Sequence, residues 1–336
     1  MNLVYGQRPT VNSLYVSKYL RVLLLTVVCG LWTFRTSAQT KFDFVVAKDG
    51  SGNFATVQEA FNAVPDFRKN ITTIFIKNGI YKEKLILAGS KTNVRLIGED
   101  AAKTILTYDD YASKKNKFGE EIGTTGSSSF FSFADGFTAE HITFENSSGP
   151  VGQAVAVRVD GDMIKFIDCR FLGFQDTLYP HAEKSRQYYK DCYIEGTVDY
   201  IFGWSTAVFD HCTIFTKENG LYVTAASTLP ETIYGFVFLN CKITGDAPDA
   251  SVYLGRPWRP FAKTVFINCS LDKLIKAEGW HNWNKPDAEK TSFYAEYKSV
   301  GEGANNNARV PWSHQLTDEE SKNYTLEKIL GDWKIN

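Results

Sequence analysis

The feature that most constrains the fold of this 336-residue chain is a recurring segment in its middle part. Each copy has apolar or aromatic residues followed by Asp, Asn or His, and five of the six copies then have Cys. The copies end at positions 146, 169, 192, 212, 241 and 269, so the steps between them are 23, 23, 20, 29 and 28 residues. A period of about 20–30 residues is typical of a solenoid.

The composition of the copies indicates which kind of solenoid forms. They are rich in β-branched and aromatic residues and leave no room for a long helix, which predicts a parallel β-helix of stacked coils. The repeated cysteines then form an internal stack of small buried side chains. For Cys192 and Cys212, one short coil apart, a disulfide is the alternative, since stacked coils provide the required Cα separation of about 4.4–6.8 Å.

Helix signals flank the repeats. Thr56 and Glu59 match a T-x-x-E capping box, and the apolar residues that follow share one helical face until Pro65 ends the run. Thr317 begins a second capped segment near the C-terminus. The expected fold class is therefore all-β, a parallel β-helix with a short N-terminal capping helix and a C-terminal tail containing helices.

Residues 1–38 differ from the rest of the chain. Basic residues precede an apolar run over residues 22–32, and the small residues Ser37 and Ala38 follow. This pattern predicts a secretory signal peptide cleaved near Ala38, which leaves one domain over residues 39–336 in a secreted or periplasmic protein. An N-terminal membrane anchor is the alternative, although the run has about half of the ~20 apolar residues that a span needs.

The charge balance argues against a nucleic-acid partner. The chain has 37 Lys and Arg and 38 Asp and Glu; without the four basic residues of the signal segment, the net charge is 33 − 38 = −5. Nucleic-acid binding and tight charge-driven binding to a polyanion both need a basic surface. The histidine spacing does not suggest zinc, and the sequence has no G-x-S-x-G elbow of a serine hydrolase.

Three polar residues follow the strict part of the repeat. Gln153, Asp176 and Asp199 are separated by 23 residues each, so coils of that length would stack them about 4.8 Å apart, with Gln175 beside them. Two such carboxylates repel when both are ionised, and one of them then retains its proton more readily. Acid–base catalysis uses this separation of roles. The alternative is that both aspartates cap turns between strands.

Five short segments extend this hypothesis: Gly79-Ile-Tyr-Lys-Glu83, Gln153-Ala-Val-Ala-Val157, Gln175-Asp-Thr-Leu178, Asp199-Tyr-Ile-Phe-Gly203 and Leu254-Gly-Arg-Pro-Trp258. In this order and spacing they closely resemble the signature segments of pectin methylesterases (pectinesterases), and the resemblance covers residues 43 to about 335. It implies a right-handed parallel β-helix that removes methyl groups from pectin and releases methanol, without a metal or other cofactor. Pectin is the expected partner, and we expect a monomer that contacts no membrane after signal removal.

The resemblance also implies roles for individual residues. Asp199 would be the nucleophile and Asp176 the general acid and then base. Gln175, with help from Gln153, would stabilise the oxyanion, and Arg256 would hold Asp199 ionised. The expected substrate contacts are Trp258, Thr124, Phe202 and Tyr200, the last of which would add a hydroxyl near the nucleophile.

Several points stay open. Trp204 stands where many members of the family have a small or polar residue, and residues 223–228 lack the Gln-Gly-Arg of plant-type members. Trp280 and Trp283 either stack on sugar rings or pack the tail on the solenoid, and we expect Glu83 to be a structural partner of a loop. The alternative functions are hydrolysis of another ester or thioester, cleavage of the pectin chain, and non-catalytic glycan binding.

Overall fold

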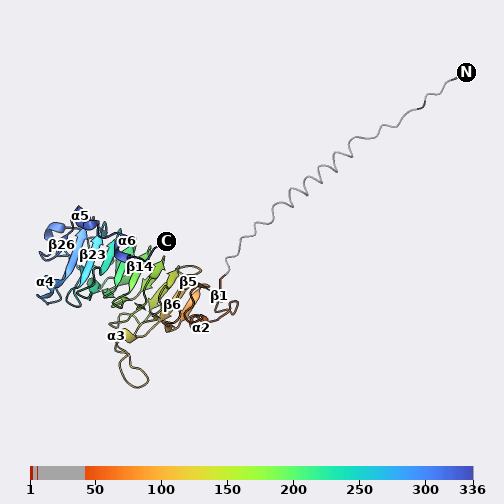
Figure 1. Cartoon of the computed structure of the whole chain (residues 1–336), viewed down its shortest axis with the longest axis horizontal. Helices are drawn as coiled ribbons and strands as arrows, with labels where there is room; N and C mark the ends of the chain where they lie inside the picture. The colour runs from red at the N-terminus through yellow and green to blue at the C-terminus, as the bar shows by residue number, and fades with distance from the viewer. Residues whose placement is uncertain (3–5, 7–41, 336) are drawn as a thin grey trace. The chain divides into compact units, whose positions relative to one another are not determined.

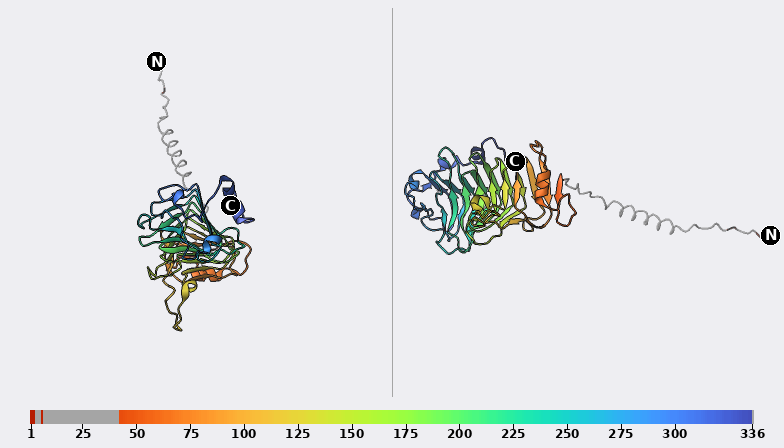
Figure 2. Two further views of the ribbon diagram at one scale, coloured as in Figure 1. Left: turned by 90° about the vertical axis from the view of Figure 1, so that its left-hand side faces the viewer. Right: turned by 90° about the horizontal axis from the view of Figure 1, so that it is seen from below.

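The computed structural model describes residues 1–2, 6 and 42–335. The predicted signal peptide and its cleavage site therefore lie almost entirely outside the described residues. Residues 42–335 form coils that stack along one direction, with their strands side by side (Figure 1), and the two further views agree (Figure 2). Within this part of the chain, no helix combines the length and apolar character needed to cross a membrane.

Every strand pairing between the coils is parallel, and the strands form three sheets. The 11-stranded sheet has the order β1 (Phe44–Val46), β2 (Thr72–Ile76), β5 (Val94–Gly98), β8 (Thr138–Glu140), β11 (Ile164–Ile167), β14 (Arg186–Lys190), β17 (Thr206–Asp210), β20 (Phe236–Leu239), β23 (Lys263–Ile267), β25 (Phe293–Tyr297) and β26 (His314–Gln315).

The other two sheets complete each coil. The eight-stranded sheet comprises β3 (Gly79–Lys82), β6 (Thr104–Tyr108), β9 (Thr143–Asn146), β12 (Arg170–Leu172), β15 (Tyr193–Gly196), β18 (Thr213–Thr216), β21 (Lys242–Gly245) and β24 (Ser270–Leu271). The seven-stranded sheet comprises β4 (Leu85–Leu87), β7 (Phe130–Ser132), β10 (Val157–Val159), β13 (Leu178–Pro180), β16 (Val198–Gly203), β19 (Tyr222–Ala226) and β22 (Tyr253–Gly255). The predicted parallel β-helix is confirmed.

The helices are short. They are α2 (Val57–Ala63), α3 (Gly123–Gly126), α4 (Ala288–Thr291), the 3-10 helix η1 (Asn306–Ala308), α5 (Asp318–Ser321) and α6 (Leu326–Leu330). The capping box at Thr56 and the capped helix start at Thr317 both form as predicted, and the cap at Thr317 is also a capping box. The Glu83 carboxylate accepts hydrogen bonds from the first backbone amides of α2, at 3.0 and 3.1 Å, so its role is structural as expected, but its partner is the start of a helix and not a loop.

The backbone conformation explains why each repeat cysteine follows an Asp, Asn or His. The residue before each repeat cysteine has φ between 48° and 54°, in the left-handed region: Asp168, Asp191, His211, Asn240 and Asn268. Asp, Asn and His are several-fold enriched in this conformation among non-glycine residues. The recurring Asp, Asn or His therefore forms the sharp turn between two sheets, and the next residue points into the core.

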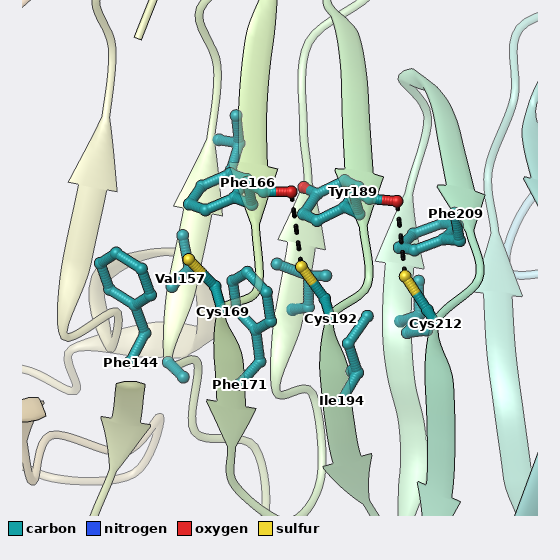
Figure 3. Packing of buried hydrophobic residues seen from close by; sticks show 14 of the residues in the cluster. Phe144, Val157, Phe166, Cys169, Phe171, Tyr189, Cys192, Ile194, Phe209 and Cys212 are labelled. Atoms are coloured by element: carbon teal, nitrogen blue, oxygen red, sulfur yellow. Dashed lines mark hydrogen bonds between the residues drawn. The ribbon is translucent and has the colours of Figure 1, made fainter. Parts of the chain in front are cut away.

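The cysteines occupy that core position on successive coils, as Figure 3 shows for Cys169, Cys192 and Cys212. Each thiol donates to a backbone carbonyl of the preceding coil; Cys192 bonds to the Phe166 carbonyl at 3.4 Å. All five are free and buried, so the disulfide alternative is wrong for this structure. Beside them an aromatic ladder fills the interior, with Tyr189 and Phe209 stacked 4.7 Å apart.

The C-terminal tail covers part of the 11-stranded sheet. Ile329 and Leu330 of α6 pack against buried residues of β14, β17 and β20. Arg186 of β14 holds this tail through a hydrogen bond to the Leu330 carbonyl and an ion pair with Asp332. The tail therefore lies on a different sheet from the one that carries the polar signature residues.

Candidate active site

A cavity of about 410 Å³ lies over the outer face of the seven-stranded sheet. Eight of the nine residues predicted for the site line it: Gln153, Gln175, Asp176, Asp199, Arg256, Trp258, Thr124 and Phe202. The remaining lining residues are Gly123, Thr125, Tyr179, Ala225 and Trp283. The coils therefore bring together residues that are as much as 160 positions apart in the sequence, from Gly123 to Trp283.

The two aspartates lie on neighbouring coils at the start of strands. The Asp176 amide donates to the Val198 carbonyl at 3.1 Å, and Leu178 pairs with Ile201. Both aspartates have left-handed backbones, with φ of 66° for Asp176 and 50° for Asp199. Such a conformation in a non-glycine residue costs about 1–3 kcal/mol and is common where a fold holds side chains for function.

The register corrects one expectation. Gln153 pairs with Gln175 in an isolated parallel bridge, so Gln153 is not level with Asp176 as a strict 23-residue coil requires. Farther along this coil Val157 pairs with Leu178, a step of 21 residues, whereas Leu178 pairs with Ile201, a step of 23. Gln153 still reaches the cavity, because the glutamines and Asp176 stand at the same edge of the sheet.

Arg256 anchors Asp199. Its Nε and Nη2 donate to the two carboxylate oxygens at 2.9 and 2.7 Å, a bidentate geometry. The guanidinium lies between two rings, 3.8 Å from the centroid of Tyr222 and 3.7 Å from that of Trp283. Cation–π attraction to both faces fixes the plane of the guanidinium, and therefore the orientation of the carboxylate. Burial raises the pKa of Asp199, while the hydrogen bonds and charge of Arg256 oppose that rise.

Asp176 has a different environment. Its side chain is 4% exposed, and among the described residues no group donates a hydrogen bond to its carboxyl. Burial, and after it the nearby charge of Asp199, raises the pKa of Asp176 well above its ordinary value. Desolvation is therefore the larger cause, and the charge of Asp199, the cause expected from the sequence, is the smaller one. One aspartate is thus held as a carboxylate by an arginine, and the other favours the protonated form.

The two glutamines supply unused donors. Within the described part of the chain, the side-chain amides of Gln153 and Gln175 have no hydrogen-bond partner, and both line the cavity beside Asp176. A glutamine amide presents two N–H donors. Donors left free in this position are available to an oxygen that carries negative charge.

Aromatic side chains form the floor and one wall of the cavity. Tyr179 and Phe202, on successive coils, stack with centroids 4.1 Å apart, and Trp258 lies 5.9 Å from Phe202. Sequence reasoning missed Tyr179 and Tyr222. For Tyr179 the signal was available, because Leu178 faces the core and alternation along a strand directs the next side chain to the opposite face.

A break in this alternation overturns the expectation for Tyr200: the pairing of β16 with β19 shifts register between Val198 and Ile201, and Tyr200 and Ile201 both face the core. Its side chain is completely buried, and its hydroxyl shares a 2.8 Å hydrogen bond with Thr216 inside the coil. Tyr200 therefore adds no hydroxyl near Asp199, and the assignment as a substrate contact is wrong. The two C-terminal tryptophans have different environments. Trp280 is buried and stacks on Tyr294 at 4.3 Å, whereas Trp283 lines the cavity.

Comparison with known proteins agrees with the fold and the signature segments. Residues 43–332 match the family profile described as Pectinesterase. Pectinesterase 31 of Arabidopsis thaliana is 41% identical over 290 residues, which cover 85% of this chain and 91% of that protein. The chain spans only 48% and 49% of two other Arabidopsis thaliana relatives, which are named pectinesterase/pectinesterase inhibitors.

Solved structures are similar over the same part of the chain. Pectin methylesterase from carrot has a TM-score of 0.80 and 34% sequence identity, covering 88% of this chain and 94% of its own. A pectin methylesterase in complex with hexasaccharide VII has a TM-score of 0.77 and 31% identity, covering 88% and 98%. By its family profile, its relatives and its fold, this chain belongs to the Pectinesterase family.

Proposed function

We propose that this protein is a pectin methylesterase, which hydrolyses methyl esters of galacturonate units and releases methanol. The observation that carries the proposal is the unequal pair of aspartates in one cavity: Asp199 is bound bidentately by Arg256, whereas Asp176 is buried without such a partner. Ester hydrolysis through a carboxylate needs one ionised and one protonated acid. Membership of the family and the carbohydrate complex of a relative support pectin as the substrate.

In the first step, an Asp199 oxygen attacks the ester carbonyl carbon and forms a tetrahedral intermediate. The negative charge that develops on the carbonyl oxygen accepts hydrogen bonds from the free amides of Gln153 and Gln175, each worth about 3–4 kcal/mol in a comparable site. Asp176 donates its proton to the departing methoxy oxygen, so methanol leaves and an anhydride links Asp199 to the sugar carboxyl.

In the second step, Asp176 is a carboxylate and accepts a proton from water. The hydroxide equivalent attacks the sugar acyl carbon, the bond to Asp199 breaks, and the galacturonate unit is released as its carboxylic acid. Asp176 is again protonated and Asp199 again paired with Arg256. Both acids return to their starting states, and the acid product loses its proton to bulk water.

The aromatic floor supports a carbohydrate as the occupant. Trp258, Phe202 and Tyr179 present apolar faces to the cavity. Such faces suit the C–H face of a pyranose ring, and a few polar groups at one edge then orient the ester. Thr124 on α3 also lines the cavity and is a candidate contact for the polymer.

Methanol release from methyl-esterified polygalacturonate tests this proposal. The wild-type protein should release methanol, Asp199→Ala should not, and Asp272→Ala, which removes a carboxylate outside the cavity, should retain activity. The absence of methanol with wild-type protein would refute the function. Wild-type turnover by a folded Asp199→Ala variant would refute only the role of Asp199.

The proposal includes export of the protein. The apolar run over residues 22–32 followed by Ser37 and Ala38 supports cleavage near Ala38 and a secreted or periplasmic mature protein of residues 39–336. We expect the mature protein to be a monomer. Its N-terminal sequence and its mass in solution, measured after export from the producing cell, test these two points; an uncleaved, membrane-bound product would contradict the first.

A further inference from the structure

A second cavity of about 520 Å³ lies beside the candidate active site and shares no lining residue with it. Its walls come from the turn after β16, which carries Trp204, and from the segments that follow β19 and β22. We call it the Trp204 pocket, defined by Trp204, Ser227, Leu229, Arg259 and Phe261, with Glu183 at its rim. The signature segments do not account for it.

The two cavities meet at an aromatic wall. Trp258 lines the candidate active site, and its ring centroid lies 6.5 Å from that of Trp204 in the second cavity. The Arg259 guanidinium lies 5.5 Å from the Trp258 ring. A polymer that leaves the active site past Trp258 therefore meets Trp204 and Arg259 next.

The Trp204 pocket contains two polar side chains without a hydrogen-bond or ion-pair partner among the described residues. The Ser227 side chain is 2% exposed, and its hydroxyl has no hydrogen-bond partner among the described residues. A buried hydroxyl without a partner is unfavourable, so such a group usually has a ligand or a water. Within the same residues, the Arg259 guanidinium forms no ion pair, although guanidinium groups bind carboxylates in bidentate fashion.

The charges around the pocket favour one anionic group. Arg259 is the one cationic side chain among the residues that line the pocket. The carboxylate of Glu183 lies exposed at the rim, where solvent and salt screen its charge. The indole of Trp204 is partly exposed and offers a surface for a pyranose ring.

We propose that the Trp204 pocket binds a galacturonate unit with a free carboxylate, its ring against Trp204 and its carboxylate on Arg259 and Ser227. This inference rests on the proposed function, because it places the unit on the same polymer whose ester lies in the active site. The pocket distinguishes an acid from a methyl ester, because only the acid carries the charge that Arg259 pairs with.

Equilibrium binding of hexagalacturonate, which has no ester to be hydrolysed, tests the inference with the intact chain. Arg259→Gln should weaken binding about tenfold or more, and Arg259→Lys should restore part of the loss because it keeps the charge. Trp204→Ala should weaken binding by a similar factor. Lys242→Gln, which removes one exposed positive charge from β21, is the matched control and should bind like the wild type.

The outcomes separate this inference from the proposed function. If the wild type releases methanol but Arg259→Gln and Trp204→Ala bind hexagalacturonate as tightly as Lys242→Gln, the inference is overturned and the function stands. Absence of hexagalacturonate binding by the wild type also overturns it. If no methanol is released, the function itself fails, whatever the binding result.

Discussion

Replacement of Arg256 by Leu probes the pairing on which the proposed chemistry depends. The substitution removes both hydrogen bonds to Asp199 and the guanidinium between Tyr222 and Trp283. Asp199 then stays buried, with 7% of its side chain exposed, but has lost its main counter-charge. Since burial raises the pKa of Asp199 and Arg256 opposes that rise, the variant should need a higher pH to ionise its nucleophile.

The magnitude follows from the geometry. A hydrogen bond to a charged group is worth about 1.5–3 kcal/mol, so the two bonds from Arg256 stabilise the ionised form of Asp199 by about 3 kcal/mol or more. Because about 1.4 kcal/mol corresponds to a tenfold change in rate, methanol release at neutral pH should fall about 10²-fold or more. Removing one partner of a buried pair should also lower the free energy of unfolding by about 3–5 kcal/mol.

The assay is methanol release as a function of pH, together with thermal unfolding. The acidic limb of kcat/KM should move to higher pH in Arg256→Leu, and the loss of stability should shrink at acidic pH, where Asp199 is protonated. Arg309→Leu is the matched control, since Arg309 forms a similar buried bidentate pair with Glu296 outside the cavity. An unchanged acidic limb in Arg256→Leu would refute the role of Arg256.

Three further predictions concern neighbouring features. Asp176→Asn should cut methanol release about 10²-fold or more, yet it should raise the melting temperature at neutral pH. A carboxyl whose pKa is raised in the folded state lowers the stability of the protein as pH climbs from about 4 towards that pKa, and the amide does not. Melting curves that match the wild type at every pH would contradict this. Tyr222→Leu should slow turnover about 3- to 30-fold, whereas Tyr222→Phe, which keeps the ring over Arg256, should match the wild type. Equal rates for the two variants would count against a role of the Tyr222 ring in orienting Arg256. Because Cys192 and Cys212 are free, a reducing agent should leave the melting temperature unchanged, and a drop would reveal a disulfide.

Local sequence patterns predicted the elements that depend on local contacts. The capping box at Thr56 forms because its donors and acceptors lie within one helical turn. The repeat predicted the stacked coils, because each Asp, Asn or His before a cysteine marks a turn with a left-handed backbone. The signature segments contain seven of the eight expected site residues that line the cavity, and Thr124 is the eighth.

The expectations for Gln153 and Tyr200 were wrong because they inferred a position in the fold from residue spacing alone. A coil one residue shorter than expected pairs Gln153 with Gln175 instead of Asp176. The strand at Tyr200 directs that side chain into the core, since a shift of one residue moves a side chain to the opposite face of a sheet. The length of a single coil cannot be read from its own residues, and neither can a register shift that breaks the alternation of a strand, as between Val198 and Ile201.

The sequence by itself therefore determined the class of fold, the family and the residue types available for chemistry. Only the tertiary structure decided how those residues differ from one another. Asp176 and Asp199 are the same amino acid, and their pKa values diverge because Arg256, which is 57 residues beyond Asp199, reaches one carboxylate and leaves the other buried without a partner. That difference arises from desolvation and charge, which depend on what the stacked coils place around each side chain.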